Sequence, residues 1–291
     1  MTKKQSELLK QIVFLGPAII FFTLIVFIPF IGGMMYSFTS WNGVSDNITY
    51  VGFDNIIKLA KDESFIKSFM FTAKFTVTSV IISNGFGLLL ALILTKALKS
   101  AKILRTVFFI PNVISGLLLG FIWQFIFVKG FASIGELTGL AFFDLPWLGT
   151  SNTAFWALII VTVWQTSGYL MIIYIAGIMN VSPELKEAAS IDGATSWQQF
   201  KDVTLPMIMP SITVCLFLSI SWAFKMFDLN FSLTKGGPFN STKSVALDIY
   251  VEAFQNSRYG TGAAKALVFF VVVAIITAIQ VKVTKGKEVE A

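Results

Sequence analysis

Long apolar stretches constrain the fold of this chain more than any other feature. Six of them read as candidate spans, at roughly residues 12–38, 69–98, 106–128, 154–179, 207–230 and 263–281. A helix needs about 20 predominantly apolar residues to cross a hydrocarbon layer about 30 Å thick. The composition agrees, because 55% of the residues are hydrophobic and 13% are charged, more apolar than a soluble domain needs. The sequence therefore predicts an all-α integral membrane protein with about six transmembrane helices.

The distribution of basic residues predicts the orientation of these spans. If the amino terminus is cytoplasmic, residues 1–11, 96–105, 181–206 and 282–291 lie on that side and hold 12 Lys and Arg in 57 residues. The loops on the other side hold 7 in 86 residues. Because cytoplasmic loops are enriched in Lys and Arg, we expect both termini in the cytoplasm. Residues 12–281 are then a single transmembrane domain between two short terminal segments.

Several classes of protein are disfavoured by what the sequence lacks. It has no histidine and a single cysteine, Cys215, so the commonest general base and an internal disulfide are both missing. It contains no G-x-x-x-x-G-K-[ST] loop for binding nucleotide phosphates. The net charge of +6 comes from residues that flank apolar runs, which predicts no nucleic-acid partner. The first apolar run is too long for a cleaved signal peptide and is expected to remain as a span.

The longest polar segment on the predicted cytoplasmic side is residues 181–206. Ser182 is a favourable N-cap, and Pro183 suits the first position of a helix. Glu184 and Glu187 fall in the first turns, where the helix dipole favours negative charge. These residues predict a short helix at the start of the segment.

The same segment then predicts a turn and a second helix. Asp192-Gly193 is a turn signal, since glycine can adopt a positive φ, and a second short helix is expected from Thr195 or Ser196. Ala188 and Ala189 give the first helix a small apolar face. From the residues alone, this helical hairpin is either a docking element for another protein or an amphipathic loop lying on the membrane.

The hairpin carries a recognisable set of anchors, namely Glu187-Ala188-Ala189, Asp192-Gly193-Ala194, Phe200, Leu205-Pro206 and Pro210. This pattern resembles the EAA loop of the membrane subunits of binding-protein-dependent ABC importers. The resemblance implies that the hairpin, placed before the fifth span, forms a coupling helix that seats on a cytoplasmic ATPase. Glu184 and the anchors from Glu187 to Pro206 are then the expected ATPase contacts.

A second region, residues 233–254 followed by residues 259–267, narrows the resemblance. It is similar to the permeases of carbohydrate importers of the maltose-transporter first-permease type, through Leu233, Thr234, Gly236, Gly237, Pro238 and Thr242. The family implies a heterodimer with a second permease in a bacterial cell membrane, two cytoplasmic ATPase subunits and an extracytoplasmic solute-binding protein. It implies no cofactor in this chain, because the partner ATPase binds ATP and magnesium.

A sugar site needs aromatic faces and hydrogen-bonding groups in a cavity away from lipid. The residues expected there, in the fourth and fifth spans, are Gln165, Thr166, Tyr169, Ser219, Trp222, Ala223 and Met226. Tyr169 matches a family tyrosine, whereas Ala223 and Met226 stand where the family has amides. Helix packing by these side chains remains an alternative to sugar binding.

Two pairs of residues, one of glycines and one of charged residues, predict contacts within or between helices. Gly116 and Gly120 form a G-x-x-x-G, a spacing that permits close contact between helices. Lys225 and Asp228 are three residues apart and are expected to pair on one helix.

These residues and resemblances together predict a permease subunit of an ATP-driven importer of a sugar or oligosaccharide. We expect it to work by alternating access and not to hydrolyse ATP itself. One alternative is the same machine importing a non-sugar solute such as glycerol phosphate. An anionic substrate favours arginine in the pathway, and the predicted spans contain none. The other alternative, a stand-alone secondary transporter, predicts internal repeats and buried carboxylates. We see no clear repeat.

Overall fold

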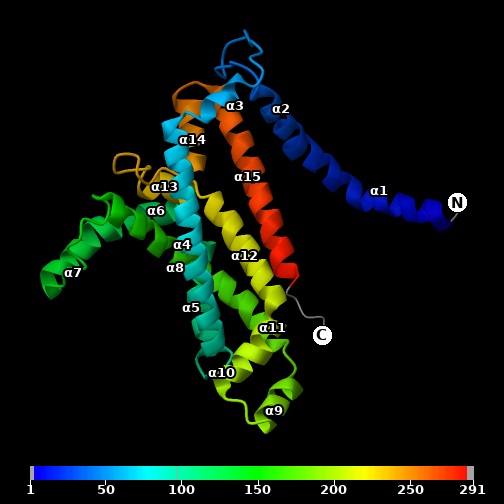
Figure 1. Cartoon of the computed structure of the whole chain (residues 1–291), viewed down its shortest axis with the longest axis vertical. Helices are drawn as coiled ribbons and strands as arrows, with labels where there is room; N and C mark the ends of the chain where they lie inside the picture. Colours follow the sequence, from blue (N-terminus) through cyan, green and yellow to red (C-terminus); the bar gives the residue numbers. More distant parts are fainter. Residues whose placement is uncertain (1–2, 97, 287–291) are drawn as a thin grey trace. The chain divides into compact units, whose positions relative to one another are not determined.

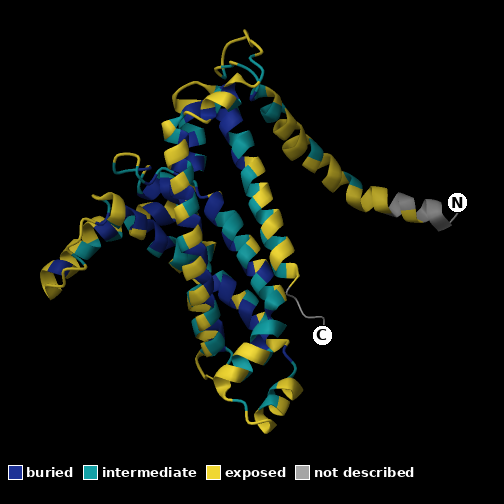
Figure 2. Ribbon diagram, viewed as in Figure 1, coloured by how far each residue is buried: buried dark blue, intermediate teal, exposed yellow. Residues whose placement is uncertain are grey.

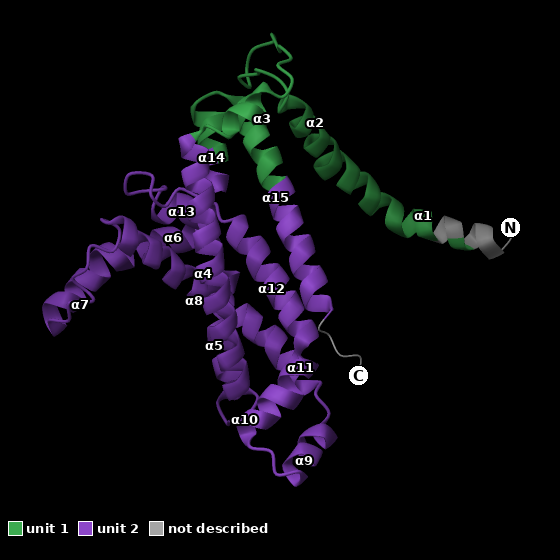
Figure 3. Ribbon diagram, in the orientation of Figure 1, with its two compact units in different colours: residues 1–62, 249–270 green, residues 63–248, 271–291 purple. Residues whose placement is uncertain are grey.

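The computed structural model describes residues 3–96 and 98–286, which fall into two compact units (Figure 3). Unit 1 consists of residues 1–62 and 249–270, and unit 2 of residues 63–248 and 271–291. Residues 1, 2 and 287–291 of the predicted terminal segments lie outside the described residues.

Helices make up nearly all of the regular structure (Figure 1). In chain order they are α1 (Lys3–Phe22), η1 (Thr23–Phe27), α2 (Ile28–Tyr36), α3 (Asp54–Leu59), α4 (Glu63–Leu94), α5 (Ala101–Val113), α6 (Gly116–Phe125), η2 (Ile126–Gly130), α7 (Phe131–Thr138), α8 (Ser151–Met179), α9 (Pro183–Ile191), α10 (Ser196–Gln198), η3 (Gln199–Thr204), α11 (Leu205–Met207), α12 (Met209–Phe224), α13 (Asp228–Leu233), α14 (Val245–Tyr250), η4 (Val251–Gln255) and α15 (Tyr259–Lys285). The η elements are single π-helical turns that continue neighbouring helices.

Five helical stretches of the described chain are long and apolar enough to cross a membrane, namely Gln11–Tyr36, Glu63–Leu94, Gly116–Thr138, Ser151–Met179 and Tyr259–Lys285. A sixth is present if the bent pair Ser196–Met207 and Met209–Phe224 is one span. The prediction of an all-α protein is therefore confirmed. The structure has five or six candidate spans where about six were predicted. The side of the membrane on which each terminus lies stays a prediction.

The core of unit 2 forms where α4 packs on α8 and α12. Phe75 and Leu158 are fully buried there. Figure 2 colours the chain by burial and shows buried segments among these helices. Gly87 of α4 lies against the Ser167 carbonyl and the Leu170 side chain of α8. Since lipid supplies no hydrophobic drive between helices, close packing at small residues holds such a core together.

The predicted G-x-x-x-G is a packing face. A Cβ atom at Gly120 would overlap Ser232 Oγ of α13, and one at Gly116 would lie 3.2 Å from Asp228 Cβ. These glycines therefore let α6 approach α13 at backbone distance.

α8 approaches α5 closely at Gly168, where a Cβ atom would overlap the backbone carbonyl of Phe108. A backbone atom cannot move aside as a side chain can, so Gly168→Val is expected to push the two helices apart. Overpacking of this kind costs about 1–3 kcal/mol, and the midpoint of thermal unfolding in detergent should fall. Gly85→Val is the matched control, because nothing lies within 4 Å of the Cβ position at Gly85. Equal midpoints for the two variants would contradict the predicted contact.

The prediction of one continuous helix over residues 106–128 is wrong. α5 ends at Val113, Ile114 is extended with ψ 130°, and α6 begins after it. Pro111, Asn112 and Ser115 interrupt the apolar run here, but proline is tolerated inside membrane helices, so these residues alone do not predict a break. The candidate span begins at Gly116 and continues to Thr138.

The fifth predicted span, residues 207–230, is also not one straight helix. At its start, the helical stretches Ser196–Met207 and Met209–Phe224 meet at a bend of 69°, where prolines flank Ile208 and interrupt the backbone hydrogen bonds. α12 ends at Phe224 and α13 begins at Asp228. Lys225 therefore lies in the turn after α12 and Asp228 begins α13, so the prediction that they pair on one helix is wrong. Ending the helix here directs both charges to a cavity instead of to lipid.

Candidate functional site

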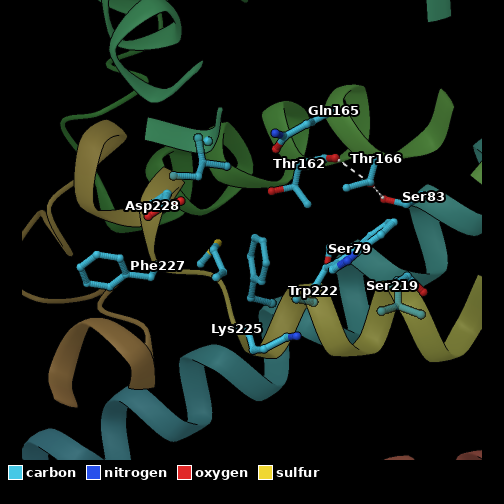
Figure 4. Close-up of a pocket in the computed structure, with 16 residues that line it drawn as sticks. Ser79, Ser83, Thr162, Gln165, Thr166, Ser219, Trp222, Lys225, Phe227 and Asp228 are labelled. Carbon is cyan, nitrogen blue, oxygen red and sulfur yellow. Dashed lines mark hydrogen bonds between the residues drawn. The ribbon is translucent and has the colours of Figure 1, made fainter. Parts of the chain in front are cut away.

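A polar cavity of about 300 Å3 lies in unit 2 between α4, α8 and α12. Gly116 of α6 and the chain between α12 and α13 also line it, and Figure 4 shows Lys225, Phe227 and Asp228 from that part of the chain. Its polar lining consists of Ser79, Ser83, Thr162, Gln165, Thr166, Ser219, Lys225 and Asp228. Trp222 and Phe227 supply aromatic rings. The cavity therefore combines hydroxyl, amide and aromatic groups on transmembrane helices.

The structure brings together most of the side chains that the sequence proposed for a substrate pathway. Those that line the cavity are Gln165, Thr166, Ser219, Trp222, Ala223 and Met226. Tyr169 is not part of the lining. Its ring contacts the Trp222 ring edge-on, with centroids 5.3 Å apart, and stacks on Phe109 at 6.3 Å. Tyr169 thus supports Trp222 from behind.

Hydrogen bonds within the protein hold the walls of the cavity. Gln165 donates from Nε2 to the carbonyl of Ile114 at 3.1 Å, which satisfies a backbone group exposed by the break between α5 and α6. Thr166 donates from Oγ1 to the carbonyl of Thr162 at 2.8 Å and lies 3.1 Å from Ser83 Oγ. The side chains are therefore preorganised before any ligand binds.

The polar wall continues behind the cavity at Asn84. Its Nδ2 donates to Ser219 Oγ at 2.9 Å, and its Oδ1 accepts from Tyr174 at 2.8 Å. By contrast, the buried Oγ1 of Thr162 has no hydrogen-bond partner among the described residues. It is a lining group whose bonding capacity remains for a ligand.

Sequence reasoning missed the contribution of α4. Ser79 and Ser83 line the cavity from this helix, and Thr162 does so from α8. A signal was present, because serines and threonines recur at helical spacing along α4, at Ser68, Thr72, Thr76, Ser79 and Ser83. Such a stripe marks the protein-facing side of a membrane helix. It does not by itself distinguish helix packing from a cavity wall.

The second candidate site is the predicted helical hairpin, which is present. α9 begins after Ser182, whose Oγ accepts from Glu184 N at 3.3 Å. α9 ends in a Schellman motif, in which Gly193 N donates to Ser190 O and Ala194 N donates to Ala189 O at 2.9 Å. This motif requires a left-handed residue after the C-cap, and Gly193 has φ +79°. The left-handed backbone at this position therefore explains why a glycine joins the two helices.

The second helix of the hairpin starts with a capping box. Thr195 Oγ1 accepts from Gln198 N, and Gln198 Oε1 accepts from Thr195 N at 2.8 Å. The hairpin exposes Glu184, Glu187, Ala188, Asp192 and Gly193, whereas Ala189, Ala194, Phe200, Leu205 and Pro206 are half-buried. Ile191 is 86% exposed and Trp197 is 68% exposed. A short, well-capped helix thus presents acidic and apolar side chains together.

Comparison with known proteins identifies the family. Residues 83–288 match the model of the family described as "Binding-protein-dependent transport system inner membrane component". The chain belongs to this family. It is a multi-pass inner-membrane permease of an ABC transporter, the transport component and not the catalytic one.

Curated relatives cover nearly the whole permease. The "Probable starch degradation products transport system permease protein AmyD" of Thermoanaerobacterium thermosulfurigenes is 46% identical over 277 residues, which are 95% of this chain and 94% of that protein. The "Multiple sugar-binding transport system permease protein MsmF" of Streptococcus mutans is 36% identical, over 90% of this chain and 91% of that protein.

Solved structures have the same fold. A permease in a bacterial transporter "involved in the import of the acidic polysaccharide alginate" aligns with a TM-score of 0.82, at 24% identity over 97% of this chain and 96% of that one. A second structure of such a transporter, "in complex with alginate pentasaccharide-bound periplasmic protein", aligns with a TM-score of 0.81 at 25% identity, over 95% of this chain and 93% of that one.

Proposed function

We propose that this permease forms the pathway by which an ABC importer takes up a neutral sugar or oligosaccharide. The observation that carries the proposal is the cavity, whose wall combines Trp222 with hydroxyl and amide groups held by protein hydrogen bonds. An aromatic face with a few fixed polar groups is the chemistry that binds a hydroxylated ring. The 46% identity to a permease named for starch degradation products supports the same substrate class.

The charges of the cavity favour a neutral substrate over an anion such as glycerol phosphate. Among the described lining residues, Lys225 is the cation and Asp228 is an anion, so the formal charges cancel. A phosphate site is expected to offer arginine or several cationic groups. The glycerol phosphate alternative therefore has less support.

The assembly we propose contains a second permease, two cytoplasmic ATPase subunits and an extracytoplasmic solute-binding protein. Residues 12–281 form a single transmembrane domain, and both termini lie in the cytoplasm. The hairpin from Pro183 to Pro206 docks on an ATPase, which binds ATP and magnesium. Closure of the ATPase dimer moves the hairpin, and the cavity then alternates between outward and inward access. The exposed, capped helix α9 supports this role.

Uptake of sugar by the reconstituted transporter with its binding protein tests the proposed site. Trp222→Ala is expected to reduce uptake about tenfold, since an aromatic contact is worth up to about 1.5 kcal/mol and 1.4 kcal/mol is a factor of ten. Trp156→Ala is the matched control, because Trp156 is on α8 but 43% exposed and outside the cavity. Uptake that is equally fast in both variants, or import of glycerol 3-phosphate in place of sugars, would contradict the proposal.

A further inference from the structure

A second cavity in unit 2 is larger than the first and has no part in the function proposed so far. Its volume is about 1000 Å3, against about 300 Å3 for the polar cavity described above. The early turns of α4 and α8 and the loop from Phe239 to Lys243 line it. We call it the outer cavity, and the first one the inner cavity.

The two cavities lie along the same faces of two helices. On α4, Ser68 and Phe71 line the outer cavity, and Phe75 and Ser79 line the inner one. These positions are three or four residues apart and so share one face of the helix. From Phe71 to Ser79 the helix rises about 12 Å. On α8, Phe155 lines the outer cavity and Thr162 lines the inner one, seven residues or two turns further along.

Aromatic rings form the wall between the cavities. The ring of Phe71 stacks on that of Phe75, with centroids 6.0 Å apart, and meets Phe155 edge-on at 6.2 Å. Phe71 and Phe155 face the outer cavity, whereas Phe75 faces the inner one. These three buried rings therefore separate the residues that line one space from those that line the other.

The outer cavity offers unused hydrogen-bonding groups. Ser68 is 2% exposed and lines the cavity, yet its Oγ has no hydrogen-bond partner among the described residues. The Oγ of Ser241, from the loop, is also buried without one. A buried hydroxyl without a partner costs free energy, which a ligand hydroxyl in the cavity would recover. Asn152 adds an exposed amide to the same lining.

The charges of the outer cavity are mostly offset within the protein. Lys243 pairs with Asp248 at 2.8 Å, and Lys67 pairs with Glu63 at 2.9 Å. The ammonium of Lys74 lies 4.6 Å from the centre of the Phe155 ring. Hydroxyls, an amide, aromatic faces and paired charges are better matched to a neutral polyhydroxy compound than to an anion.

We propose that the outer cavity is a second carbohydrate subsite, which holds the part of an oligosaccharide that the small inner cavity cannot contain. The inference rests on the proposed function and names its substrate class, namely neutral chains of several sugar units. The aromatic wall at Phe71, Phe75 and Phe155 is then the point through which a chain threads from one subsite to the other.

The test compares short and long sugars in the complete transporter, reconstituted with its binding protein and ATPases. The probes are maltose with maltohexaose, and cellobiose with cellohexaose. Asn152→Leu and Ser68→Ala are expected to raise KM for the imported hexasaccharide at least fivefold and to leave KM for its disaccharide within twofold. Asn47→Leu, in an exposed loop of unit 1, is the control and should change neither value. Ser68→Ala should also leave the thermal midpoint unchanged or raise it, because the hydroxyl that it removes has no partner.

The remaining outcomes distinguish failure of the outer subsite from failure of the proposed function. Equal effects on both sugar lengths, no effect on either, or a wild type that imports the disaccharide alone would overturn the outer subsite and leave the proposed function in place. A phospholipid that copurifies with the wild type and is lost from both variants would assign the cavity to lipid and also overturn it. A wild type that imports none of the four sugars would overturn the proposed function, and the subsite with it.

Discussion

A double substitution in the hairpin, Glu187→Arg with Gly193→Pro, is expected to abolish ATP-driven uptake and to release the ATPase from the purified complex. Glu187 is exposed on α9, and the substitution reverses the charge that it offers to a basic partner. Gly193 has φ +79°, which proline cannot adopt because its ring holds φ near −65°. The Schellman motif would be lost, and with it the end of α9. The measurement is the subunit composition of the affinity-purified complex, together with uptake in proteoliposomes.

The second permease should remain in that complex, because Glu187 and Gly193 both lie outside the candidate spans. Asp46→Arg, a charge reversal in an exposed loop of unit 1, is the control and should retain both the ATPase and uptake. Retention of the ATPase by the double variant would show that the hairpin is not the coupling element. Purification of the wild type alone, with transport intact, would contradict the proposed assembly.

Substitution of Lys265 by Met is expected to destabilise the protein by about 3–5 kcal/mol, the cost of removing one partner from a buried ion pair. Lys265 is 1% exposed, and its Nζ lies 2.8 Å from Asp62 Oδ2 and 3.6 Å from Glu252 Oε2. Arg258 contacts the other oxygen of Glu252 at 3.4 Å. Without the ammonium, two carboxylates of unit 1 lose their shared cation. The thermal midpoint of the purified complex measures the loss.

Two further variants test whether the loss of stability comes from the burial of the Lys265 ion pairs. Lys58→Met breaks a pair with Asp54 whose side chains are 73% and 61% exposed, and such pairs contribute little, so its midpoint should stay near that of the wild type. Adding Glu252→Gln to Lys265→Met should recover part of the loss, because it removes one of the two carboxylate charges that the Lys265 ammonium offsets. A midpoint for Lys265→Met that equals that of Lys58→Met would contradict the buried cluster.

The hairpin was predictable in detail because its structure is made by local hydrogen bonds. The Ser182 cap and the Gly193 turn join residues no more than five positions apart, and their signals are individual residue types in the right order. The same is true of the spans, because the length of an apolar run is a sufficient condition for crossing lipid. The predicted third span was displaced because the chain breaks at Ile114, and the predicted fifth span was too long because α12 ends at Phe224.

The candidate cavity was predictable only on α8 and α12. Gln165, Thr166, Ser219 and Trp222 were found because polar and aromatic residues are conspicuous in apolar spans. The serines of α4 were missed because a small hydroxyl residue is equally suited to helix packing. Lys225 and Asp228 were assigned to each other, since the end of α12 between them was not foreseen.

The sequence by itself determined that the chain is helical, that it enters the membrane several times and that a capped polar hairpin interrupts the spans. These properties depend on hydropathy and on contacts between near neighbours in the chain. Only the tertiary structure decided which polar side chains share a cavity, that a second cavity lies along the same faces of α4 and α8, and that Lys265 is buried between two carboxylates. Asp62 and Lys265 are some 200 residues apart in the chain, and no local pattern specifies which distant residues will meet when helices pack.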